Sequence, residues 1–306
     1  MDERERGGRP TPTAVRPREG AGPVKKDTAG KGAIGKDTEG KDIAGKGARP
    51  GKKGAAGKRG GRKKVRWIPD QHGAWAMLAV PFLAGTLLAP HPTPWHALLL
   101  PTWVLGYIAS FHAQQWLRLR RLSRNPRAAG RHVRPALVLG GVFAACALPL
   151  AWTHPWLLLA AGCAAPFVAV NTWHAWRNRE RALVNGLAAV VPACGMLVVT
   201  LVLGGGTPAE GWAPALACLL YFGGTVPYVK TMIREKNSPG YRRASIALHA
   251  VLVPAAAALS PWLALPFAGY LLRAVVMPRT GAKVAVVGAV EVLGSLALLL
   301  TLTLAF

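Results

Sequence analysis

Acidic residues are scarce in this chain, and most of them lie in one part of it. The 306 residues include 38 Lys and Arg but only 13 Asp and Glu, which gives a formal net charge of +25. The mean hydropathy is nevertheless positive, at +0.25. One soluble domain does not combine such charge with such hydropathy. The chain therefore divides into two segments, of which residues 67–306 contain five acids: Asp70, Glu180, Glu210, Glu235 and Glu291.

Cysteine motifs and a cleavable signal peptide are also missing. The four cysteines lie singly in apolar runs, with no CxxC and no His at metal-ligand spacing: Cys146, Cys163, Cys194 and Cys218. This pattern argues against a disulfide framework and a metal site, so we expect neither a metal nor a cofactor. The N-terminus lacks the apolar core of a signal peptide, so the first apolar segment must itself direct insertion.

Residues 1–65 are predicted to form a disordered, Lys- and Gly-rich cytoplasmic tail. Within residues 24–50 a five-residue unit repeats, with Lys leading and Gly usually closing it. Frequent glycine opposes a helix, and high charge with low hydrophobicity opposes a core. The basic residues attract anionic lipid headgroups, by about 1 kcal/mol each near the surface. The alternative is a solvated tail that helps hold the N-terminus inside. No nucleic-acid partner is expected, because no aromatic or structured module accompanies the charge.

Residues 66–306 contain long apolar runs, which a soluble domain lacks. A helix needs about 20 residues to cross the hydrocarbon layer of a membrane. The fold class is therefore all-α, a polytopic transmembrane bundle of about nine helices. The third and fourth expected spans, and the seventh and eighth, are separated only by short Pro-containing connections, at 153–155 and 260–261. The expected spans are 74–90, 95–115, 135–152, 155–173, 183–203, 212–230, 243–259, 261–277 and 284–305.

Lys and Arg are absent from every second connection between these spans. All 18 basic residues after Arg66 lie in or beside four alternate connections, and the other four have none. Cytoplasmic loops of membrane proteins are enriched in Lys and Arg. The pattern predicts a multi-pass protein of the bacterial plasma membrane, with its N-terminus inside and its C-terminus outside. Three basic connections are 116–134, 174–182 and 229–243, and the fourth carries Arg279 and Lys283, with Arg273 just before it.

Polar side chains gather in the cytoplasmic half of the predicted bundle. Unsatisfied polar groups are costly in lipid, so these side chains should face the bundle interior or a wet cavity. We expect a cytoplasm-facing cavity for an anionic or lipidic ligand, such as an isoprenoid or another lipid. Hydrogen bonding between helices, or a position at headgroup level, is the structural alternative. The ligand-binding candidates are Gln71, His72, His112, Gln115, Asn171, His174, Tyr228, Lys230, Arg234 and His249.

Five arginines are candidates for an anionic group, because a planar guanidinium donates to phosphate through two N–H groups. Glu291 is the only carboxylate deep within a predicted span. It is a functional candidate, or it pairs with an arginine of an inner loop, or its surroundings hold it neutral. His91 and His96 lie on the outer side and are given no role, and the catalytic residues are unknown. The five arginines are Arg118, Arg121, Arg124, Arg242 and Arg243.

Two stretches resemble the YwiC-like family of bacterial multi-span membrane proteins. One is WIPDQHGAWAMLAVPFLAG at 67–85, and the other runs from YVKTMIREK at 228–236 to YRRASIALH at 241–249. The resemblance covers about residues 66–306. The family pattern has Asn where this chain has Asp70. The resemblance implies a membrane protein whose molecular function is not established.

A weaker, architectural resemblance is to the UbiA-type prenyltransferases. Nine helices with basic loops after the second and sixth are similar to that arrangement, and the two loops, 121–131 and 233–243, are similar to each other. Those enzymes bind magnesium and a prenyl diphosphate through Asp-rich loops, whereas both loops here lack Asp. A divergent prenyltransferase and a small-molecule or proton-coupled transporter therefore remain alternatives.

Overall fold

The computed structural model describes residues 66–69 and 72–306, which lie in a compact unit running from Arg62 to Phe306. The predicted tail, Gln71 and the side chain of His72 lie outside the described residues. All nine expected spans are helices, and their bounds are α1 (His72–Leu88), α2 (Pro94–Leu122), α3 (Pro126–Thr153), α4 (Trp156–Trp176), α5 (Leu183–Leu203), α6 (Pro208–Ile233), α7 (Pro239–Leu259), the 3-10 turn η1 (Pro261–Leu263), α8 (Ala264–Thr280) and α9 (Val284–Ala305).

The described residues contain no strand, which confirms the all-α prediction. Seven helices are long and apolar enough to cross a membrane: α3 to α7, η1 with α8, and α9. The apolar helix α1 is shorter, with 17 residues. The chain is thus a multi-pass membrane protein. The expected breaks at both Pro-containing connections are confirmed, because α3 ends at Thr153 and α7 ends at Leu259.

Four helices begin with a cap residue followed directly by proline. The caps are Thr93, Asn125, Thr207 and Ser238. Cap side chains accept hydrogen bonds from free N–H groups of the first turn, and proline suits the first position because its own N–H is not needed there. The expected start of α2 lies within one residue of the observed one, whereas α6 and α7 begin four residues and α3 nine residues before their expected starts at 212, 243 and 135.

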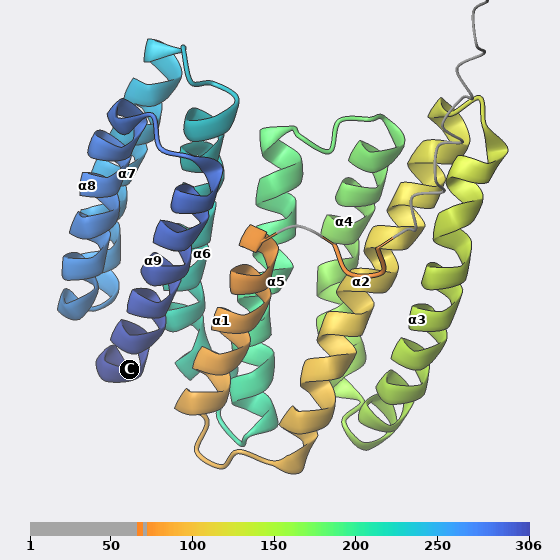
Figure 1. The fold of residues 1–306 in the computed structure, drawn as a ribbon. Helices are drawn as coiled ribbons and strands as arrows, with labels where there is room; N and C mark the ends of the chain where they lie inside the picture. Colours follow the sequence, from red (N-terminus) through yellow and green to blue (C-terminus); the bar gives the residue numbers. More distant parts are fainter. Residues whose placement is uncertain (1–65, 70–71) are drawn as a thin grey trace, which may run out of the picture. The chain divides into compact units, whose positions relative to one another are not determined.

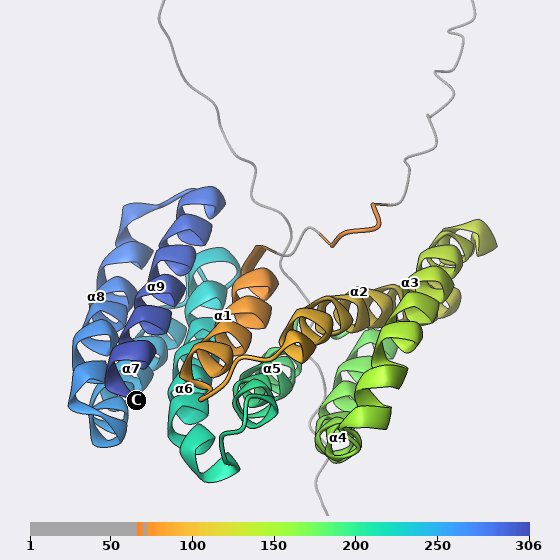
Figure 2. The ribbon, with the colours of Figure 1, turned by 90° about the horizontal axis from the view of Figure 1, so that it is seen from below.

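The helices run alternately up and down, so the connections gather at two ends of the unit (Figure 1). We call the end with the α2–α3, α4–α5, α6–α7 and α8–α9 connections the basic end, and the other the opposite end. Helices α1 and α5 lie centrally, between the group α2 to α4 and the group α6 to α9 (Figures 1 and 2). The arrangement separates the polar residues of the two groups.

Helices α1 and α5 approach closely at Gly85. A Cβ on Gly85 would lie 2.1 Å from the Leu197 carbonyl oxygen and 2.1 Å from Thr200 Oγ1. Thr200 Oγ1 also donates to the Phe82 carbonyl of α1 at 3.3 Å. A small residue at this point lets the two backbones meet, as in other membrane helix pairs.

His96 has a structural role that the sequence did not indicate. Its side chain is buried, and Nε2–H donates to the Thr200 carbonyl of α5 at 2.9 Å. Its Nδ1 accepts from the Thr93 N–H at 3.1 Å, as in a capping box. The residue expected at the outer membrane interface thus joins α2 to α5.

Candidate functional site

A polar network joins α2 to the α4–α5 connection at the basic end. Arg118 Nη1 donates to Glu180 Oε2 at 2.9 Å, and Gln115 Nε2 donates to Glu180 Oε1 at 2.9 Å. Arg118 Nε donates to Asn178 Oδ1 at 2.9 Å. Asn178 has φ = 57°, a left-handed conformation that Asn tolerates better than most residues. The network therefore neutralises Arg118 and holds the connection against α2.

Asn171 and Asn185 join α4 to α5. Asn171 Nδ2 donates to the Asn185 carbonyl at 2.8 Å and to its Oδ1 at 3.0 Å, and Asn185 Nδ2 donates to the Glu180 carbonyl at 2.9 Å. This is hydrogen bonding between helices, the structural alternative to ligand binding. Asn171 Nδ2 thus has two acceptors, and Asn185 Nδ2 has one.

His112 is fully buried in α2 between two partners. Its Nε2 lies 2.9 Å from the Trp67 carbonyl, and its Nδ1 lies 2.9 Å from Nδ1 of His132 on α3. A carbonyl oxygen only accepts, so Nε2–H donates to Trp67. One of the two Nδ1 atoms donates to the other, so the hydrogen bond joins α2 to α3. The pair links the segment before α1 to both α2 and α3.

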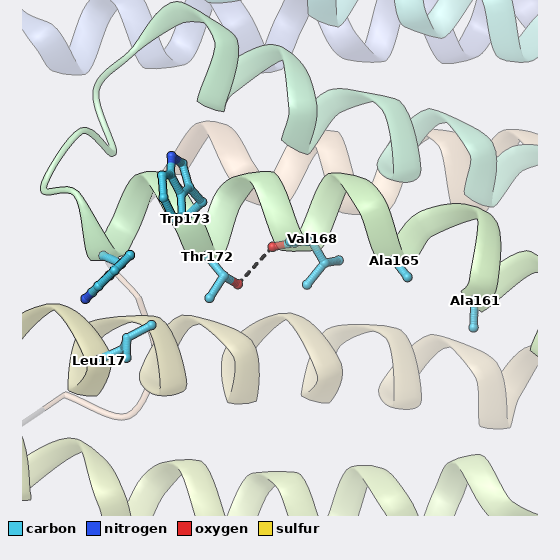
Figure 3. A pocket seen from close by; sticks show the side chains of 8 residues that line it. Leu117, Ala161, Ala165, Val168, Thr172 and Trp173 are labelled. Atoms are coloured by element: carbon cyan, nitrogen blue, oxygen red, sulfur yellow. Dashed lines mark hydrogen bonds between the residues drawn. The ribbon is translucent and has the colours of Figure 1, made fainter.

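An apolar groove of about 570 Å³ runs between α4 and α2. Ala161, Ala165 and Val168 point from α4 toward α2, and Leu117 points back from α2 (Figure 3). Thr172 also lines the groove, but its hydroxyl donates to the Val168 carbonyl at 2.8 Å. The groove wall is therefore almost wholly apolar, as expected of a lipid-facing surface.

The groove ends at Trp173 and Trp176, whose ring centroids lie 5.2 Å apart. The Arg177 guanidinium lies 4.6 Å from the Trp173 centroid, and that of Arg121 lies 5.0 Å from the Trp176 centroid. Arg121 also donates to the Trp176 carbonyl at 2.9 Å. Neither arginine has a carboxylate partner among the described residues. Stacking on the rings fixes both cations at the end of an apolar groove.

A second polar cluster lies inside the group α6 to α9. Arg273 of α8 and Glu291 of α9 form a buried ion pair, with Nη1 and Oε1 2.5 Å apart. The side chain of Tyr228 is fully buried, and the Arg273 guanidinium lies 4.2 Å from its ring centroid. Glu291 is thus paired with an arginine within α8, and not with an arginine of an inner loop, which was one of the expected alternatives.

His249 of α7 belongs to this second cluster. Its side chain is buried, its ring centroid lies 6.3 Å from that of Tyr228, and its Nδ1–H donates to the Ser245 carbonyl at 2.7 Å. The Lys230 ammonium lies 5.6 Å from the ring of Tyr241, nearer the basic end.

The remaining candidates have less specific surroundings. His174 is half-buried, and its Nδ1 has no hydrogen-bond partner among the described residues. Arg242 is also half-buried. The exposed candidates are Arg124, Arg234 and Arg243.

The described candidates thus form two groups and do not line one cavity. Five candidates belong to the group α2 to α4: His112, Gln115, Arg118, Arg121 and Asn171. Tyr228 and His249 belong to the group α6 to α9. The partners that sequence reasoning missed are His132, Glu180 and Arg273, which lie 20, 62 and 18 residues along the chain from His112, Arg118 and Glu291. For Arg273 a signal was present, because a cation within an apolar run calls for a buried partner.

Among residues 66–69 and 72–306, no group of three or more His, Cys, Asp or Glu is placed to hold a metal ion. The described residues offer arginines, tyrosines and histidines, whose chemistry is hydrogen bonding to anions. The two arrangements that stand out are the groove with its stacked arginines and the buried pair of Arg273 with Glu291.

Comparison with known proteins identifies the family. The family model described as YwiC-like protein matches residues 68–201. The protein named Uncharacterized protein YwiC, from Bacillus subtilis, is 33% identical over 212 residues, which are 68% of this chain and 84% of that protein. An uncharacterised protein of Haemophilus influenzae is 31% identical over 227 residues, 73% of this chain and 92% of that protein. No solved structure matches the chain. The chain therefore belongs to the YwiC-like family.

Proposed function

We propose that this chain binds an anionic lipid in the groove between α2 and α4. The protein would lie in the bacterial plasma membrane with its basic end in the cytoplasm, as its Lys and Arg distribution predicts. The observation that carries the proposal is the termination of an apolar groove at two tryptophans, each stacked against an arginine.

The two parts of the groove match the two parts of a lipid. The wall of small and branched apolar residues accepts a hydrocarbon chain, and its volume of about 570 Å³ is in the range of small-molecule sites. Trp rings favour the membrane interface, where a lipid headgroup begins. Arg121 and Arg177 then face the level of the phosphate.

The charges near the groove differ in availability. Arg118 is paired with Glu180, so it adds little attraction for an anion. Arg121 and Arg177 have no described carboxylate partner, so they can donate to phosphate oxygens. The anionic headgroup would therefore contact these two residues and not the whole basic surface.

Quenching of tryptophan fluorescence by brominated lipids tests the proposal. The full chain is placed in nanodiscs of phosphatidylcholine that contain either brominated phosphatidylglycerol or brominated phosphatidylcholine. We expect stronger quenching by the anionic lipid, and loss of the excess when Trp173 and Trp176 are both replaced by Phe. In Arg121→Gln/Arg177→Gln the preference for phosphatidylglycerol over phosphatidylcholine should fall about thirtyfold, since each basic residue contributes about 1 kcal/mol.

The matched control is Arg124→Gln/Arg243→Gln, which removes the same charge from exposed positions. It should keep the preference. Equal losses in the two double variants would show that charge alone attracts the lipid, and the groove would then not be the site. Turnover of a labelled prenyl diphosphate by the purified protein would favour the prenyl-transfer alternative.

A further inference from the structure

Two arginines with no carboxylate partner in the described part of the chain share one ring at the end of the groove. The guanidinium carbons of Arg121 and Arg177 lie 5.0 and 5.9 Å from the ring centroid of Trp176. The two carbons are therefore at most 10.9 Å apart, the sum of these distances. Both side chains are exposed, so each can turn its N–H groups toward a common acceptor. The pair offers two positive charges to one anionic group.

Both arginines also keep hydrogen-bond donors free. A guanidinium carries several N–H donors, and those along its edges remain free when its face lies against a ring. Arg121 uses Nη1, which donates to the Trp176 carbonyl at 2.9 Å. Among the described residues, the Arg177 guanidinium contacts the rings of Trp173 and Trp176 and donates to no acceptor. The oxygen atoms of one phosphate can therefore accept from both residues.

The surroundings of the pair are strongly positive. Residues 116–125 and 174–182, at the ends of α2 and α4, contain seven arginines and one glutamate. That glutamate, Glu180, is paired with Arg118 at 2.9 Å. The C-terminal ends of the two helices add only partial negative charge. A headgroup with a single negative charge would leave the pair of Arg121 and Arg177 with a net positive charge, whereas a dianion would neutralise it.

Phosphate headgroups differ in charge according to the number of their ester bonds. A phosphodiester, as in phosphatidylglycerol, carries a single negative charge. A terminal phosphate monoester carries about −1.5 to −2 at pH 7, because its second pKa is about 6, and it presents three oxygen acceptors. The monoester therefore matches both the charge and the free donors of the arginine pair.

We propose that the groove selects lipids whose headgroup is a terminal phosphate monoester. This inference rests on the proposed lipid site and specifies its ligand. The hydrocarbon chain lies along Ala161, Ala165 and Val168, which line the groove. The phosphate lies at the end of the groove and accepts from Arg121 and Arg177. A diester lipid binds more weakly there, because it leaves one positive charge of the pair without a counterpart.

Bromine quenching by lipids with identical acyl chains tests the inference. The full chain is placed in phosphatidylcholine nanodiscs that contain brominated phosphatidic acid, phosphatidylglycerol or phosphatidylcholine at one mole fraction. Phosphatidic acid has the monoester, and phosphatidylglycerol has the diester. At pH 8 we expect the affinity for phosphatidic acid to exceed that for phosphatidylglycerol by about fivefold or more, which corresponds to about 1 kcal/mol.

The ratio of these two affinities should depend on pH in one direction. At pH 5 the monoester is mostly singly charged, as the diester is, so the ratio should approach one. It should rise toward pH 8 as the second proton leaves the phosphate. The nearby arginines stay charged throughout. The other titratable side chains of α2, α3, α4 and the α4–α5 connection at this end are His112, His132, His174 and Glu180, and residues 183–193 of α5 contain none.

A change in the charge of these side chains acts on both lipids, so the ratio of the affinities isolates the phosphate. His174→Gln should therefore keep the pH dependence. Arg121→Gln and Arg177→Gln should each bring the ratio at pH 8 close to one, because a single positive charge of the pair then remains.

Arg120→Gln is the matched control. Arg120 is also exposed, and its guanidinium lies 5.2 Å from the ring centroid of Trp116, which does not line the groove. This variant should keep both the ratio and its pH dependence. An equal loss in Arg120→Gln and Arg177→Gln would show that general surface charge selects the dianion, and the inference would be wrong.

The remaining contrary results separate this inference from the lipid site itself. Equal affinities for phosphatidic acid and phosphatidylglycerol at pH 8, both above that for phosphatidylcholine, would leave the lipid site standing without selection for the monoester. Equal quenching by all three lipids would remove the lipid site as well. Loss of the preference when inorganic phosphate is added at the concentration of the lipid would assign the two arginines to a soluble phosphate.

Discussion

Two Arg–Glu ion pairs in this protein differ in burial, and burial changes what an ion pair contributes to stability. Arg118 and Glu180 have side chains 32% and 30% exposed, whereas Arg273 and Glu291 have side chains 6% and 11% exposed. Exposed pairs contribute at most about 1 kcal/mol, because solvent screens them. A buried pair carries a large desolvation cost and is weak evidence of stabilisation. The burial of the second pair is therefore not evidence that it stabilises the fold.

The histidine pair on α2 and α3 gives a prediction at the residue scale. His132→Ala removes the hydrogen-bond partner of His112 Nδ1 and leaves a fully buried nitrogen without a partner. We expect the free energy of unfolding to fall by about 1–3 kcal/mol. Thermal unfolding in detergent, compared with the native chain, measures the loss.

His91→Ala is the matched control, because His91 is exposed. Its effect should stay within about 0.5 kcal/mol. A loss in His91→Ala as large as that in His132→Ala would show that the buried pair has no special contribution.

The contact of His112 with Trp67 predicts a second effect. Protease access to the segment before α1 should increase in His112→Ala, whose imidazole holds that segment.

At the scale of elements, the contact between α1 and α5 depends on the absence of a side chain at Gly85. Gly85→Ala would place a Cβ 2.1 Å from the backbone oxygen of Leu197, so the helices must move apart. Overpacking costs about 1–3 kcal/mol, and backbone gives way less readily than a flexible side chain. We expect a loss at or above the top of that range, seen as a lower unfolding temperature.

Gly195→Ala on α5 is the control for this change. Nothing lies within 4 Å of a Cβ at Gly195, so the substitution should be neutral or slightly stabilising through helix propensity. If the two variants unfold at the same temperature, α1 and α5 do not meet as closely as the structure shows.

At the scale of the whole molecule, the alternation of basic connections leads to a test of orientation. Ala209 at the start of α6 and Asn237 after its end are both exposed and lie at opposite ends of the helices. In a chain whose four native cysteines are replaced by alanine, Ala209→Cys should react with an impermeant maleimide on intact cells. Asn237→Cys should react only after the membrane is opened, because its connection is basic.

The reverse labelling pattern would place the basic end outside the cell. The orientation predicted from Lys and Arg would then be wrong, and the groove would face the outer leaflet. Labelling of both sites on intact cells would indicate damaged membranes, which a cytoplasmic marker enzyme detects.

Most of the helices could be predicted closely from sequence because their signals are local, although α3 begins at Pro126 and not at the expected residue 135. Apolar runs of bilayer length and the breaks at the Pro-containing connections each act within a few residues. The predicted span 183–203 coincides with α5. The candidate site could be predicted only in part. Hydropathy and charge predict the depth of a residue in the membrane, but they do not predict which side chains lie beside it in the membrane plane.

The sequence by itself determined the fold class and indicated the family, and it predicts the level at which polar residues lie. Only the tertiary structure decided which of them meet. His112 and His249 share a predicted depth, yet one bonds to His132 on α3 and the other packs beside Tyr228 on α6. Hydropathy and charge place residues along the membrane normal, since the bilayer varies in that direction. Neighbours within its plane depend on close packing, such as the contact at Gly85, which has no counterpart in local sequence.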